Sequence, residues 1–134
     1  GANANHTSLS FSFDLIFLRN QNSNEAVTYE VISVICFGGA MLTHIVFIRF
    51  TSIEIVDEAR QKLLSMEGKI PSLRSIEVGV DITRSKRSWD LALVTRFEDQ
   101  AGLDAYGVHP VHKKVQGFLR SHATSVAAVD YLEN

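Results

Sequence analysis

The sequence predicts an α+β domain in which the elements follow the order strand, helix, strand, strand, helix, strand. Three observations predict it. Residues 42–50 are rich in Ile, Val and Phe, residues 75–82 alternate between apolar and polar positions, and residues 89–97 carry large side chains at every second position. The segments that begin after Thr51 and at Pro110 instead carry apolar residues three and four positions apart, which is the period of a helix. Strand patterns and helix patterns therefore interleave along one chain.

Composition limits the class of protein. The chain has 134 residues, enough for one domain with a core, and a formal net charge of −2. Only a short basic cluster occurs, Arg84–Arg87, and we interpret it as a solvated turn, so no nucleic-acid partner is expected. No apolar run reaches membrane-spanning length, so no membrane partner is expected either. Cys36 is the single cysteine, which excludes an intrachain disulfide and predicts a cytoplasmic protein.

Residues 1–40 differ in composition from the rest of the chain. Arg19 is their only basic residue, and Met41 resembles a natural start because the regular pattern begins right after it. Apolar residues alternate over 11–17 and again over 27–35, with a turn signal at 21–24 between them. We interpret residues 1–40 as an N-terminal extension, either a β-hairpin or a non-native upstream segment, and residues 41–134 as the domain.

The first strand and the first helix of the domain are predicted from residues 42–66. Residues 42–50 are apolar on both faces, which is typical of a strand buried on both sides. Thr51 and Glu54 predict a capping box that opens a helix. Its expected apolar face comprises Ile53, Val56, Ala59, Leu63 and Met66. Gly68 and Pro71 are expected to end it.

The remaining elements complete the pattern. Strands are predicted over 75–82 and 89–97, Asp99 is a plausible N-cap, Pro110 begins a further helix, and 123–131 is the last strand. The order is that of a ferredoxin-like fold. Its helices can cover only one face of the sheet, so the second apolar face predicts a homodimer with a barrel-like interface. Alternatively, the N-terminal hairpin covers part of that face.

The segment Tyr106–His112 carries the most chemistry. His112 is expected in the first turn of the helix that begins at Pro110, where its imidazole could act as a general base or only fix the helix start. Tyr106 could donate to a substrate oxygen or pack as core. His109 is expected to cap the helix. A metal site at His109 and His112 would need further ligands, so we predict no metal and no cofactor.

From Met41 onward the chain resembles the stress-responsive dimeric A/B barrel family, called Dabb. Four pieces carry the resemblance: Thr43–Phe47, Val78–Asp81, Asp90–Val94 and the Tyr-x-x-His-Pro-x-His segment at 106–112. The resemblance implies a ferredoxin-like protomer and a homodimer built sheet to sheet. Most members have no assigned activity.

The best-defined member is a plant polyketide cyclase that uses no bound cofactor, and the resemblance places its acid–base pair at Tyr106 and His112. A pocket histidine of its first strand falls on His44. A further pocket histidine of its third strand is replaced here by Leu91, which weakens the case for the same reaction.

Competing functions therefore stay open. One is a non-catalytic stress-responsive protein that binds a small apolar ligand in a pocket between sheet and helices. The residues expected to line that pocket are His44, Trp89, Leu91 and His109. The other is a cofactor-free cyclase or isomerase that uses His112 and Tyr106, and a small monooxygenase is a third alternative. A pocket into which Tyr106 and His112 both point would favour the enzyme, whereas bonding of both side chains to backbone would favour the binding protein.

Overall fold

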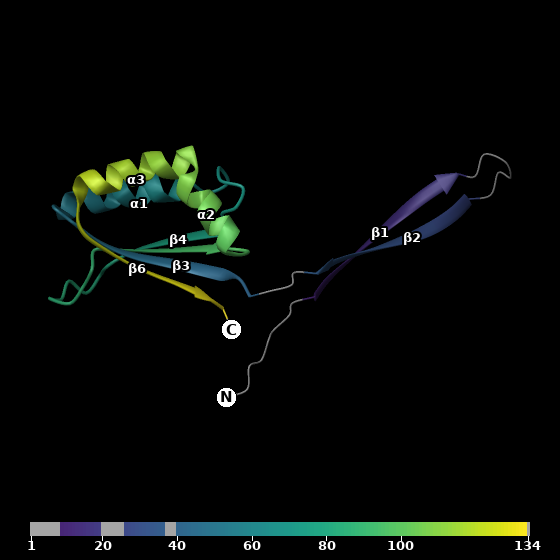
Figure 1. Ribbon diagram of the computed structural model, residues 1–134, viewed down its shortest axis with the longest axis horizontal. Coiled ribbons are helices and arrows are strands. Elements are labelled where there is room, and N and C mark those ends of the chain that lie inside the picture. The colour runs from purple at the N-terminus through teal and green to yellow at the C-terminus, as the bar shows by residue number, and fades with distance from the viewer. Residues whose placement is uncertain (1–8, 20–25, 37–39, 134) are drawn as a thin grey trace, which may run out of the picture. The chain divides into compact units, whose positions relative to one another are not determined.

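The computed structural model describes residues 9–19, 26–36 and 40–133. The chain falls into two compact units, Gly1–Gly39 and Ala40–Asn134, and each is described by itself. In the first unit, β1 (Leu9–Arg19) pairs antiparallel with β2 (Ala26–Cys36) (Figure 1). The turn expected at 21–24 lies outside the described residues, so the complete hairpin stays a prediction.

The second unit has the predicted strand and helix order. Its sheet runs β4-β5-β3-β6 with antiparallel neighbours, and the helices lie together on one face (Figure 1). The fold class is α+β and ferredoxin-like, as predicted. The elements are β3 (Leu42–Phe50), the 3-10 turn η1 (Ile53–Ile55), α1 (Val56–Leu64), β4 (Ser75–Val80), β5 (Leu91–Phe97), α2 (Gln100–Val108), α3 (Pro110–His122) and β6 (Ala123–Leu132).

The core lies between the sheet and the helices. Leu42 pairs with Phe97 and Ile48 pairs with Leu91 across β3 and β5, and all four side chains are buried. Side chains alternate between the faces of a strand, so every second residue of β3 and β5 points toward the helices. The helices contribute the buried residues Val56, Ala59, Leu63, Tyr106 and Val115.

The other face of the sheet, called the open face below, carries no helix of this unit. Its apolar residues are Ile45, Phe47, Ala92, Val94, Ala127 and Val129, which pair across the strands in register. Phe47 is 39% exposed and Val129 57% exposed. Phe47 therefore lies outside the core of this unit, because its position in β3 directs it away from the helices.

The start of α1 differs from the prediction. Ser52, not Thr51, is the capping residue, and it caps the 3-10 turn η1, since its hydroxyl oxygen accepts the backbone N–H of Glu54 at 3.3 Å. A 3-10 turn precedes α1, and it leaves Ile53 exposed rather than on the apolar face. After α1 the chain turns at Gly68, whose φ of +75° lies in the left-handed region that favours glycine.

The connection between β4 and β5 is longer than predicted. β4 ends at Val80 and β5 begins at Leu91, so Ile82 and Trp89 lie outside the strands. Ile82 is 95% exposed. The connection is closed by backbone bonds from Asp81 N to Asp90 O and from Ser88 N to Ser85 O. Within the described residues, no helix combines the length and apolarity that crossing a bilayer requires.

Candidate functional site

The junction of α2 and α3 positions the two candidate acid–base residues. Tyr106 lies in the last turn of α2, and His112 lies in the first turn of α3, two residues after Pro110. Between the helices His109 is extended, and its Nδ1 accepts the backbone N–H of Val111 at 3.1 Å. This confirms the prediction that His109 caps the helix. The same bond commits one of its ring nitrogens to the backbone.

Tyr106 is enclosed by aromatic rings. It is 2% exposed, and its ring centre lies 5.0 Å from that of Phe97 and 4.2 Å from that of His112. Burial raises the pKa of Tyr106 to about 12. Among the described residues, no hydrogen-bond partner of its hydroxyl is found. Tyr106 therefore stays protonated at neutral pH, where it can donate a hydrogen bond but gives up its proton with difficulty.

His112 is held in one tautomer by the backbone. Its Nδ1 lies 3.1 Å from the carbonyl oxygen of Gly107. A carbonyl oxygen only accepts, so Nδ1 carries the hydrogen and donates it. In the neutral ring, the lone pair is then on Nε2. Proline at the helix start and the Gly107 carbonyl one turn earlier thus present Nε2 as a proton acceptor.

The surroundings of His112 also favour its neutral form. Burial lowers the pKa of His112, and the positive charges of Lys113, His44 and Arg120 act in the same direction. The bond to Gly107 opposes them with a smaller effect. Burial is the main cause. At neutral pH the ring is therefore mostly uncharged, as a general base requires.

The edge strand β6 contributes a carboxylate, that of Asp130, to this group of residues. His44 of β3 lies directly opposite Asp130 of β6, and its Nδ1 contacts the Asp130 carboxylate in an ion pair. His44 is on the helix face of the sheet, near enough for its charge to affect His112. The sequence analysis did not find this pair, since nothing local links residues so far apart. The lone acidic residue within apolar strand 123–131 was the available signal.

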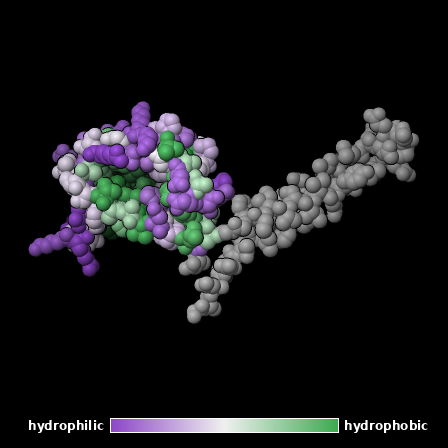
Figure 2. Space-filling view, viewed as in Figure 1, coloured by the Kyte–Doolittle hydropathy of each residue, from purple (hydrophilic) through white to green (hydrophobic). Residues whose placement is uncertain are grey.

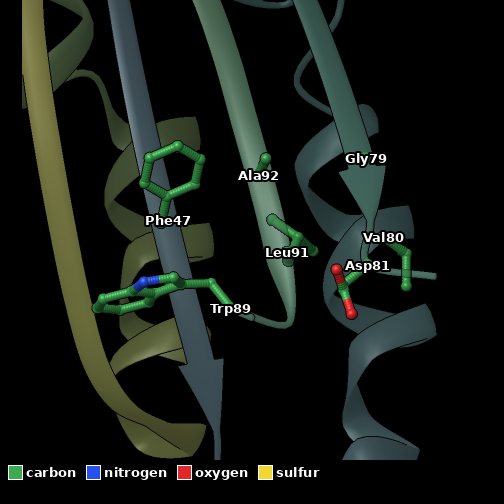
Figure 3. A pocket seen from close by; sticks show the side chains of 7 residues that line it. All are labelled: Phe47, Gly79, Val80, Asp81, Trp89, Leu91 and Ala92. Carbon is green, nitrogen blue, oxygen red and sulfur yellow. The ribbon is translucent and has the colours of Figure 1, made fainter. Parts of the chain in front are cut away.

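The structure does not bring all the predicted pocket residues together. A cavity of about 290 Å³ is lined by Trp89 and Leu91 together with Phe47, Gly79, Val80, Asp81 and Ala92 (Figure 3). It lies at the end of the open face where β4 ends. Leu91 and His44 are on the same sheet, but Leu91 pairs with Ile48 near the opposite end of β3. Trp89 is therefore separate from the Tyr106–His112 pair.

Apolar side chains also lie along the side of the domain that α3 and β6 form. Hydrophobic residues gather where the helical layer meets the sheet, on the side along which α3 and β6 run (Figure 2). β6 is an edge strand there, and Val126 and Leu132 are more than half exposed. Within the described part of the chain, no group of three His, Cys, Asp or Glu residues could hold a metal ion.

Comparisons with known proteins agree with this fold. The model of the Stress responsive A/B Barrel Domain, Dabb, matches residues 42–133. A dimeric ferredoxin-like protein of unknown function from Bacteroides fragilis is 25% identical, with a TM-score of 0.63, over 69% of this chain and 96% of that one. A second dimeric ferredoxin-like protein of unknown function, from Thermobifida fusca, is 22% identical, with a TM-score of 0.65, over 74% and 96%.

An enzyme also shares the fold. Hydroxynitrile lyase from Passiflora edulis is 16% identical, with a TM-score of 0.64, over 72% of this chain and 95% of that chain. This likeness shows the fold alone. No curated protein matches the chain significantly. Since the family model covers more than half of the chain, in the order of elements that the structure shows, the chain belongs to the Dabb family of stress-responsive A/B barrel domains.

Proposed function

We propose that this protein is a homodimer in which each copy binds a small, largely apolar molecule beside Tyr106 and His112. The observation that carries the binding proposal is the bond between His112 and Gly107, which leaves Nε2 free to accept a hydrogen bond from a ligand. A bound hydroxyl or an acidic C–H group would face this nitrogen. Apolar side chains around the pair would hold the rest of the molecule.

The homodimer is supported by the open face. Its apolar side chains are too exposed to be the natural surface of a small monomer, and a second copy is the simplest cover. The relatives from Bacteroides fragilis and Thermobifida fusca are described as dimeric. The expected location is the cytoplasm, where the single cysteine would stay reduced. A role in stress response is proposed from the family description.

A cofactor-free enzyme is the second candidate, and the His44–Asp130 ion pair favours it. In this scheme His112 Nε2 removes a proton from a carbon next to a carbonyl group. The electron pair moves onto the carbonyl oxygen, which the Tyr106 hydroxyl stabilises by donating a hydrogen bond. Returning the proton from His112 to another carbon would isomerise the substrate. Attack of the deprotonated carbon on a second carbonyl carbon would instead close a ring, with the proton on His112 passing to the oxygen of that carbonyl, as in the polyketide cyclase that the sequence resembles.

Replacing His112 by Gln tests both candidates. Binding of small aryl ketones and phenols is measured by saturation-transfer NMR, and exchange of ketone α-hydrogens for deuterium in D₂O reports proton abstraction. We expect His112→Gln to abolish the binding signal and, if exchange is catalysed, to slow it by about 10²–10⁴-fold. His122→Gln is the matched control, because His122 packs on Phe118 at the far end of α3. Unchanged binding in His112→Gln would contradict the proposal.

A further inference from the structure

The cavity on the open face is built as a small-molecule site of its own. Figure 3 shows Phe47 and Trp89 on one side and Val80 and Asp81 on the other, with β5 between them. The rings of Phe47 and Trp89 lie 6.4 Å apart at an angle of 38°. Gly79 and Ala92 pair across β4 and β5, and neither has a large side chain that would fill the cavity. An added Cβ on Gly79 would meet no atom within 4 Å, so the space above it is open.

The cavity has a single ionisable lining residue, Asp81. One carboxylate oxygen, Oδ2, accepts the backbone N–H of Arg84 at 2.7 Å, which fixes the orientation of the group. Its other oxygen, Oδ1, has no hydrogen-bond partner among the described residues. This carboxylate is fixed, has one free oxygen and lies beside apolar side chains. It favours a ligand that carries a hydrogen-bond donor, and it favours a positively charged donor most strongly.

Two arginines near the cavity are already engaged. The Arg49 guanidinium lies 4.3 Å from the centre of the Trp89 ring, and its Nε donates to the carbonyl of Ser88. Arg84 pairs with Asp90. Arg49 thus occupies a face of the Trp89 ring, which directs a second cation to Asp81 rather than to the indole. The aromatic rings are left to pack against an uncharged, flat part of the ligand.

We propose that this cavity binds a small amine: a flat apolar body against Phe47 and Trp89, and a protonated nitrogen on Asp81. The site is independent of the Tyr106–His112 pair, which lies on the other side of the sheet. In a dimer formed through the open face it would lie at the interface between the copies, at the end of the sheet. The ligand would then enter beside the connection from Asp81 to Asp90.

The single tryptophan makes the proposal directly measurable. Trp89 is the only tryptophan of the chain and lines the cavity, so its emission reports occupancy. The full chain is titrated with phenethylamine, 2-phenylethanol and 3-phenylpropanoate, which share a phenyl body and differ in charge. We expect phenethylamine to bind about tenfold more tightly than either analogue. Equal responses to all three, or no response to the amine, would overturn the proposal.

Substitutions inside and outside the cavity test which residues bind the amine. Asp81→Asn should remove the preference for the amine, whereas Glu77→Gln, which removes a charge from the exposed part of β4 outside the cavity, should leave it unchanged. Gly79→Leu should fill the cavity and abolish binding, and His112→Gln should have no effect. If Asp81→Asn keeps the preference, the proposal fails. It also fails if no amine binds and Gly79→Leu only weakens dimerisation, since a second copy would then fill the cavity.

Discussion

At the scale of single residues, the protonation state of His112 decides what the site can do. The ring shares its surroundings with a buried tyrosine, a backbone carbonyl and a paired histidine. Burial and neighbouring positive charge disfavour the imidazolium, and the carbonyl of Gly107 selects which nitrogen keeps its hydrogen. Tyr106 is the complementary group, a donor that burial keeps protonated. The pair therefore offers one acceptor and one donor at neutral pH.

We expect an NMR titration to give a pKa of His112 below the unperturbed value of about 6.5. The resonance is assigned by its absence in His112→Gln. Because the folded pKa is lowered, the unfolded chain binds a proton at His112 more readily. The free energy of unfolding should therefore fall as the pH drops below about 6.5, and this slope should be smaller in His112→Gln. A folded pKa above that of a model histidine would contradict the neutral acceptor.

At the scale of elements, short polar contacts fix where helices begin and how the last strand is held. Asp99 Oδ1 accepts the backbone N–H of Gly102 at 2.8 Å and caps α2, as predicted. At the end of β6, the Glu133 carboxylate accepts from Thr43 Oγ1 at 2.8 Å and from Arg96 Nε at 3.0 Å. These bonds lower the pKa of Glu133, so they weaken only in acid. The Asp99 cap and the bonds of Glu133 thus hold α2 and β6, the elements that carry Tyr106 and Asp130.

We expect His109→Ala to lower the free energy of unfolding by about 1 kcal/mol, the usual effect of losing an N-cap acceptor. His109→Asn supplies an oxygen for the backbone N–H of Val111 and should recover most of the loss. Urea unfolding followed by circular dichroism measures both variants. If His109→Ala is as stable as the parent, the capping bond contributes nothing and His109 is available for another role.

At the scale of the whole molecule, the open face is the surface through which we expect two copies to associate. β3 is apolar on both faces, yet the helices of its own unit cover only one. In the middle of the uncovered face, Ile45 pairs with Val94. Association with a second copy through this face would remove its apolar side chains from water. The cavity beside Trp89 and the His112 site would then lie on opposite sides of the sheet of each copy.

We expect light scattering at micromolar concentration to give the mass of a dimer, and Val94→Glu to give that of a monomer. A charge at this position would have to be desolvated between the two sheets, which is costly for an unpaired carboxylate. Val108→Glu is the control, since Val108 is 73% exposed on α2 and away from the open face. A monomeric parent protein would show that the open face is covered in another way.

The sequence by itself determined the order of elements and the caps at Asp99 and His109, because helical and strand periods and helix starts depend on residues a few positions apart. It also placed Tyr106 and His112 on either side of the break at Pro110. The predicted strands over 75–82 and 89–97 are longer than β4 and β5. The alternation of side chains continues into the connection between the two strands, which the backbone bond between Asp81 and Asp90 closes.

Tertiary structure alone decided which face each strand residue occupies and which distant residues meet. The pairing of His44 with Asp130 follows from the register of β3 with β6, and Phe47 points away from the core because of the side on which the helices pack. The same geometry separates Trp89 from His112, although both resembled pocket residues in the sequence. Register and helix placement depend on contacts between segments far apart along the chain, which no local pattern encodes.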